Sequence, residues 1–162
     1  MRIWVDADSC PRAVREIIAR AAVRRRIETL FVANRPLPDA GGPFISFVEV
    51  GKGEGEADAY IIAHAISVDL VVTRDIPLAS ALVGQGLRVL NDRGELYTAE
   101  NVRERLSVRD FMYELRSSGL SPERTGRFGG REAKAFADAF DRELARAAKT
   151  PRGPRAPEAD PR

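Results

Sequence analysis

The chain has little of the side-chain chemistry on which many metal and redox sites depend. It carries one cysteine and one histidine in 162 residues. A single cysteine excludes an internal disulfide and a cysteine-rich zinc site. A single histidine excludes any site that needs two imidazoles, such as that of the H-E-x-x-H zinc proteases.

Long apolar segments are also missing. No uncharged apolar run approaches the ~18–20 residues needed to cross a bilayer. The apolar stretch after Arg2 is interrupted by Asp6 and Asp8, so the start of the chain does not resemble a signal peptide. These absences favour a soluble cytoplasmic protein. A length of 162 residues with 44% hydrophobic content suits one compact α/β domain with a buried core.

Neither sign of charge dominates, since the formal net charge is +2. Basic residues nevertheless crowd two segments, residues 12–26 and 124–134. Such clusters can contact phosphate groups. They are also typical of solvated helix faces, and composition alone favours that second interpretation.

Short apolar runs alternate with amphipathic segments over most of the chain. This alternation predicts an α/β fold with a parallel sheet and right-handed crossovers. We expect residues 1–149 to form one domain and the proline-rich residues 150–162 to be a disordered tail. The expected strands are 2–5, 29–33, 44–50, 69–73 and 87–90, and the expected helices are one from Pro11, then 56–67, 77–83, 99–106, 108–117 and 131–148.

Aspartates follow several of the predicted strands. Asp6 and Asp8 come after the first, Asp75 after the fourth and Asp92 after the fifth. Open parallel sheets bind ligands outside the carboxyl ends of their strands, and Asp58 starts a helix at that same edge. Carboxylates that converge there repel one another unless a divalent cation is bound. Ligand sets of oxygen alone favour Mg²⁺ or Mn²⁺.

Each acid also has a purely structural interpretation. Asp75 is a suitable cap for the helix that follows it, and Asp8 is a suitable cap ahead of Pro11. Asp58 suits the positive end of a helix dipole. Asp92 fits an ordinary turn. Asp6 is the hardest to explain in this way, because a strand end in mid-sheet offers it little water.

The other reactive or aromatic side chains have simpler interpretations. Cys10 lies near a helix start, which can lower a thiol pKa, but the only histidine is far along the chain, so we expect Cys10 to be a packing residue. We expect His64 on a helix surface. Trp4, Phe111 and Met112 are predicted to lie in the core.

Several sequence blocks resemble the YaiI/YqxD family of bacterial proteins, in order from Met1 to about Leu144. They are W-V-D-A-D-S-C-P (4–11), V-A-N (32–34), A-D (57–58), V-T-R-D-I-P-L-A (72–79), L-N-D-R-G-E-L-Y-T (90–98) and R-D-F-M (109–112). That family looks like a branch of the PIN-like nuclease fold. The resemblance implies a three-layer α/β domain with a mostly parallel central sheet and a helical C-terminal region.

The resemblance also implies a function, which is Mg²⁺- or Mn²⁺-dependent cleavage of RNA by acids at the carboxyl edge of the sheet. Asp6, Asp58 and Asp75 would be the catalytic acids and metal ligands, with Asp8 and Glu56 as further ligands. A homo-oligomer is compatible with the sequence, and a membrane partner is not expected. The residues predicted to contact the nucleic acid are Asn34, Thr73, Arg124, Arg131 and Lys134.

Two departures from the family pattern keep other functions open. Gly55 stands where members commonly have an aspartate, and Asp92 stands where they usually have a proline. One alternative is a non-catalytic RNA- or protein-binding module with a vestigial acid pocket. A second depends on the opening of the chain instead: an apolar strand followed by Asp6-x-Asp8 resembles the haloacid dehalogenase phosphatases, with Asp6 as the nucleophile.

Overall fold

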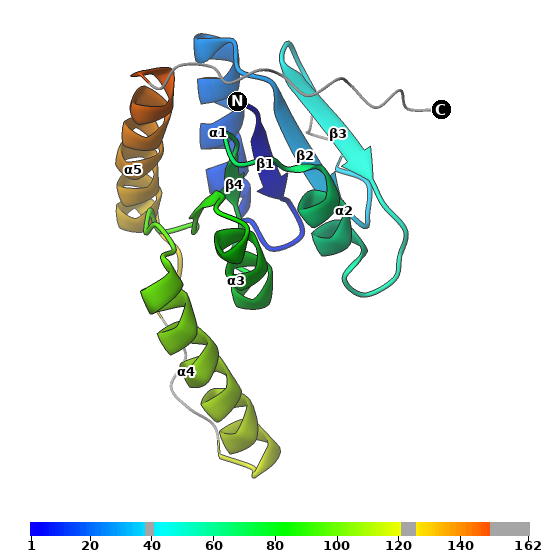
Figure 1. Ribbon diagram of the computed structural model, residues 1–162, viewed down its shortest axis with the longest axis vertical. Coiled ribbons are helices and arrows are strands. Elements are labelled where there is room, and N and C mark those ends of the chain that lie inside the picture. Colours follow the sequence, from blue (N-terminus) through cyan, green and yellow to red (C-terminus); the bar gives the residue numbers. More distant parts are fainter. Residues whose placement is uncertain (38–40, 121–125, 150–162) are drawn as a thin grey trace.

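The computed structural model describes residues 1–37, 41–120 and 126–149 (Figure 1). Within these ranges, five strands form one sheet in the order β3-β2-β1-β4-β5, and every neighbouring pair of these strands is parallel. The strands are β1 (Ile3–Asp6), β2 (Thr29–Ala33), β3 (Ile45–Glu49), β4 (Leu70–Val72) and β5 (Arg88–Leu90). The helices are α1 (Arg12–Arg25), α2 (Glu56–His64), α3 (Ile76–Gly84), α4 (Ala99–Ser117) and α5 (Gly130–Lys149).

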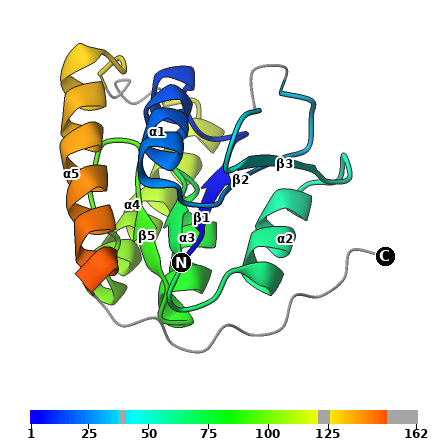
Figure 2. The same cartoon turned by 90° about the horizontal axis from the view of Figure 1, so that it is seen from above.

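Helices cover both faces of the sheet, so the fold has three layers. Helices α1 and α5 lie on one face, and α2 and α3 lie on the other (Figure 2). Successive residues of β1 point to opposite faces: Ile3 and Val5 pack with α1 and α5, whereas Trp4 packs with α2 and α3. A strand covered on both sides is apolar on both faces, which is why β1, β2 and β4 are nearly continuous hydrophobic runs. The predicted three-layer α/β fold is confirmed.

The order in which strands are added to the sheet changes sides at β1, although all the strands run in the same direction. From β1 the chain proceeds outward through β2 to β3 on one side, and then returns to β4 and β5 on the other. The carboxyl ends of β1 and β4 therefore flank the point where the connections leave in opposite directions. In open parallel sheets this switch point is where ligands bind.

Helices α3 and α4 begin at well-defined caps. The carboxylate of Asp75 accepts a hydrogen bond from the Leu78 backbone N–H at 2.8 Å, which confirms Asp75 as the cap of α3. Thr98 and Asn101 form a capping box at the start of α4.

The structure corrects the sequence prediction in the C-terminal half. Residues 99–117 form one helix rather than two. Ser107, at the predicted break, is accommodated within the helix, where its hydroxyl donates to the Arg103 carbonyl at 3.2 Å. Phe111 was predicted to lie in the core and is 57% exposed. Figure 1 shows the reason, since α4 leaves the body of the molecule and points away from it.

Two other expectations concern the ends of elements. Helix α2 ends at His64, three residues earlier than predicted. The predicted disordered tail, residues 150–162, lies outside the described residues. None of the helices in the described ranges combines the length and the apolar character needed to cross a membrane.

Candidate functional site

Asp6 is the buried centre of the acidic edge. It is the last residue of β1 and is 4% exposed. Its Oδ2 accepts hydrogen bonds from the Ser9 hydroxyl at 2.6 Å and the Thr73 hydroxyl at 2.7 Å. Burial raises the pKa of Asp6, and these hydrogen bonds only partly offset that effect. Among the described residues, no cationic side chain forms an ion pair with Asp6.

The two hydroxyls that hold Asp6 also join the loops after β1 and β4. The Thr73 Oγ1 accepts from the Asp75 backbone N–H at 2.9 Å, and the Ser9 Oγ accepts from the Arg74 backbone N–H at 3.1 Å. Thr73, predicted to contact the substrate, is 1% exposed, and its hydroxyl donates to Asp6. Ser9 was not selected from the sequence. Its position in the short loop between Asp6 and α1 could have identified it as a neighbour of the acids.

Asp75 belongs to the same electrostatic group while it caps α3. Its Oδ1 takes the capping hydrogen bond from Leu78. Its negative charge raises the pKa of both Asp6 and Asp58. The structural and the functional interpretation of Asp75 are therefore compatible.

Asp58 approaches these acids from α2. Burial raises its pKa to about 6, and the charges of Asp75, Asp6 and Asp8 add to the increase. The side chain has no hydrogen bond or ion pair within the part of the chain that the structure describes. Four acids from three segments of the chain thus gather at this edge, with Asp58 in electrostatic range of the other three.

Two acids at this edge are paired with arginines. The Asp8 Oδ1 lies 3.4 Å from the Arg35 Nε, and its Oδ2 accepts from the Asn34 backbone N–H at 2.8 Å. Asp92 is 5% exposed, and its Oδ2 lies 3.4 Å from the Arg74 Nε. Asp8 thus ties down the loop after β2 rather than capping α1. Asp8 and Asp92 therefore differ from Asp6, Asp58 and Asp75 in having a cationic partner, although the charge of Asp8 still raises the pKa of Asp58.

Arg35 and Arg74 were not selected from the sequence. Their side chains are 63% and 56% exposed, and they flank the acids on the β2 side and the β4 side. Each arginine is the second residue after a strand, Arg35 after β2 and Arg74 after β4. That position at the carboxyl edge of the sheet could have identified them from the sequence. Their ion pairs are exposed enough to contribute little to stability.

Glu56, the fifth predicted metal ligand, lies apart from this buried group. It is exposed, and its carboxylate lies over the turn formed by Gly51 and Gly53. Gly55, which precedes it, has a φ of 78°, a backbone conformation that glycine adopts without strain.

Two of the three basic residues predicted to contact nucleic acid lie in described segments, on the β5 side of the site. Arg131 and Lys134 are exposed on the first turns of α5, and Lys134 pairs with Asp138 at 2.8 Å. Arg93, in the loop after β5, donates to the Gly126 carbonyl at 2.8 Å and so holds the approach to α5. Arg124 lies outside the described residues.

The remaining reactive side chains keep structural roles. Cys10 is 4% exposed and burial raises its pKa, so the thiol stays protonated and acts as a packing residue. His64 is exposed on α2 and stacks on Tyr60 with ring centroids 4.0 Å apart. Within residues 1–37, 41–120 and 126–149, no three His, Cys, Asp or Glu side chains are close enough to hold a metal ion as they stand.

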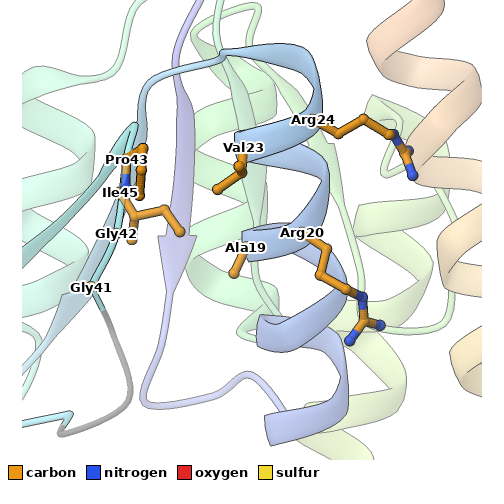
Figure 3. A pocket seen from close by; sticks show the side chains of 8 residues that line it. All are labelled: Ala19, Arg20, Val23, Arg24, Gly41, Gly42, Pro43 and Ile45. Carbon is orange, nitrogen blue, oxygen red and sulfur yellow. The ribbon is translucent and has the colours of Figure 1, made fainter.

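A separate hollow of about 440 Å³ lies between α1 and the chain that enters β3 (Figure 3). Ile45 begins β3, so this hollow is near the amino edge of the sheet, opposite the acids. It is lined by Ala19, Arg20, Val23, Arg24, Gly41, Gly42, Pro43 and Ile45. The lining contains none of the acids described above, and we do not assign the site to it.

The parallel sheet and the carboxylates at its switch point define an α/β protein with an acidic site at the carboxyl edge. Residues 4–146 match the family model described as "Uncharacterized BCR, YaiI/YqxD family", and the chain belongs to that family. The resemblance noted from the sequence is therefore confirmed.

Curated relatives agree with this assignment. A "UPF0178 protein" of Treponema pallidum (strain Nichols) is 56% identical, over 90% of this chain and 82% of the relative. A protein of the same name from Myxococcus xanthus (strain DK1622) is 50% identical, over 93% of this chain and 98% of the relative. No solved structure matches the chain.

Proposed function

We propose that the acidic edge is the metal centre of a phosphodiesterase that cleaves RNA. The observation that carries the proposal is the burial of Asp6 with neutral hydroxyls as its hydrogen-bond partners. An ionised carboxylate in such a place costs several kcal/mol unless a cation compensates it. The nearby charges of Asp58 and Asp75 add to this cost, which a divalent cation would offset.

The chemistry of the donor set fits Mg²⁺ or Mn²⁺. Asp6, Asp58 and Asp75 offer carboxylate oxygens, the ligands that these hard cations prefer. Asp75 uses Oδ1 for its cap and keeps Oδ2 for the ion. Because no three acids stand in ligand positions among the described residues, at least one must turn, and Asp58 has no partner there to hold it.

The side chains around the ion would then have different roles in the reaction. A bound ion of this class supplies a hydroxide at neutral pH and stabilises the charge that develops on the phosphate. Ser9 and Thr73 hold the Asp6 carboxylate in one orientation. Arg35 and Arg74, exposed at the rim, are placed to exchange their weak ion pairs for the phosphate oxygens of the substrate.

The nucleic-acid path would continue toward α5. Arg131 and Lys134 are exposed at the start of this helix, on the β5 side of the same edge. Phosphate contacts of this kind position a backbone without reading its sequence. We therefore propose an RNA substrate bound through its phosphates, with Asn34, the first residue after β2, at the other side of the acids.

A Mn²⁺ titration followed by thermal unfolding tests the metal centre. The melting temperature of the wild type should rise steadily with the logarithm of the Mn²⁺ concentration, because the ion binds only the folded state. Asp6→Asn should show no such rise. Asp138→Asn, an exposed change on α5, is the matched control and should respond as the wild type does. An equal rise in Asp6→Asn would refute the site.

The raised pKa of Asp58 predicts a pH dependence of stability without metal. Its pKa is about 6 in the folded chain against an ordinary value of 3.8, so between these values the folded state binds more protons than the unfolded state. Stability should therefore fall as pH rises through this window and stay constant above it. Since solvent partly screens the side chain, we expect about 1–2 kcal/mol.

Urea unfolding of wild type and Asp58→Asn at about pH 4 and about pH 7 measures this effect. The variant should be the more stable protein at the higher pH and should lose that advantage at the lower pH. Comparison with the variant removes the contribution of other acids. A stability difference that does not change with pH would show that Asp58 is not perturbed.

A further inference from the structure

Among the described residues, the hydrogen bonds that join helix α4 to the body come from its first two turns. Asn101 Nδ2 donates to the Leu96 carbonyl at 2.9 Å, and Val102 is 3% exposed. Val102 is the only buried residue that the structure describes in α4. At 1.5 Å per residue, the helix from Val102 to Ser117 runs on for about 22 Å. Figure 1 shows this length extending beyond α3, and we call residues 107–117 the α4 arm.

The arm carries an apolar stripe that the described residues cover only in part: Met112 and Leu115 are half-buried, and neither belongs to the two core clusters. Val108, Phe111, Met112 and Leu115 follow the spacing i, i+3, i+4, i+7 that places side chains on one helix face. Val108 is 50% and Phe111 is 57% exposed. A contiguous apolar face of this kind on a projecting helix marks an interaction surface. These four residues are the α4 stripe.

Charged residues are sorted by sign on the two sides of the α4 stripe. With 3.6 residues per turn, Arg109 and Arg116 lie on one side, and Asp110 and Glu114 lie on the other. All four are exposed. Arg109 has only a 3.5 Å ion pair with its neighbour Asp110, and such exposed pairs contribute little.

The charges beside the α4 stripe match those of a second, identical helix only when the two helices are parallel. When two identical helices pack in parallel about a twofold axis along their length, the basic side of each faces the acidic side of the other. In an antiparallel pair each side faces its own copy, so like charges meet. We propose that the α4 stripe binds a second copy of this chain, with the two arms parallel. This interface does not depend on the proposed metal centre.

Sedimentation of the full chain over a concentration series tests the interface. The wild type should change from monomer to dimer as its concentration rises. Phe111→Glu places a charge in the α4 stripe and should leave a monomer, with half the mass at the highest concentration. Val68→Glu, at a position 43% exposed in the turn before β4, is the matched control and should dimerise as the wild type does.

Folding of the variants is checked by their thermal unfolding. Phe111 is exposed, so Phe111→Glu should melt as the wild type does at concentrations where both are monomers. A wild type that stays monomeric at every concentration would overturn the proposal. A dimer that survives Phe111→Glu would also overturn it.

Charge exchange tests the orientation of the arms. Arg109→Glu and Glu114→Arg should each weaken the dimer, because each places like charges across a parallel interface. The double variant restores an acid opposite a base and should dimerise more strongly than either single variant. An antiparallel pair would instead be strengthened by Arg109→Glu, and that result would overturn the parallel arrangement.

Discussion

Asp6→Asn is expected to abolish Mn²⁺-dependent RNA cleavage and, at the same time, to raise the melting temperature of the metal-free protein. Asparagine has nearly the same shape and can still accept from Ser9 and Thr73. It lacks the charge that would bind the ion, and we expect cleavage to fall by at least about 10³-fold. Removing a buried, uncompensated charge should stabilise the fold by roughly 1–3 kcal/mol.

Asp75→Asn separates the two roles of the neighbouring acid. Asparagine is as good a helix cap as aspartate, so the stability of α3 should hardly change while cleavage is lost. Asp138→Asn should retain full cleavage. RNA cleavage that survives both Asp6→Asn and Asp75→Asn would refute the proposed centre. A wild type that binds Mn²⁺ and RNA without cleavage would support the alternative of a binding module.

Gly94→Ala is expected to destabilise the fold by about 3 kcal/mol or more. Gly94 has a φ of 85°, and a Cβ there would lie 2.6 Å from the Ala135 carbonyl oxygen and 2.9 Å from the Ala139 Cβ. The positive φ costs a residue with a side chain about 1–2 kcal/mol, and overpacking adds about 1–3 kcal/mol. The turn after β5 would have to separate from α5.

Gly84→Ala is the matched control for this change. Gly84 ends α3, and a Cβ built there meets nothing within 4 Å. Alanine should leave stability unchanged or raise it slightly. Urea unfolding of the two variants beside the wild type measures the difference. Equal stabilities for both variants would show that the turn is not held against α5 as described.

Strand ends were the most predictable feature of the site. A run of apolar residues that stops at an aspartate locates the end of β1 at Asp6, and the alternation of strands and helices places Asp75 at the same edge. The capping role of Asp75 could also be predicted from the sequence, because its hydrogen-bond partner Leu78 is only three positions away. These features are local in sequence, so neighbouring residues were enough to predict them.

The contacts that distinguish the acids from one another were not predictable in this way. Asp8 and Asp92 are paired with arginines, whereas Asp6 is held by Ser9 and by Thr73, which is 67 residues away. Spacing along the chain carries no signal for partners so far apart. These contacts depend on how β1 and β4 pair and on the loops that follow them.

The α4 stripe shows the same difference between what local sequence predicts and what tertiary contacts decide. The sequence predicted a helix over residues 108–117, although separate from residues 99–106, and an apolar helix face usually packs against its own domain. Phe111 and Met112 were predicted to lie in the core, but Phe111 is 57% exposed and Met112 is half-buried outside both core clusters. A periodic pattern specifies which side chains share a face but not what that face contacts.

The order of residues was thus sufficient for the α/β class, the succession of most elements, the edge where the acids gather and the family. These follow from hydrophobic period, turn residues and short-range caps, which act over a few positions. Folding the chain in three dimensions was needed to show which acids have cationic partners and that α4 projects. Burial and charge pairing arise between segments that are distant in sequence, and the free energy of a side chain depends on those neighbours.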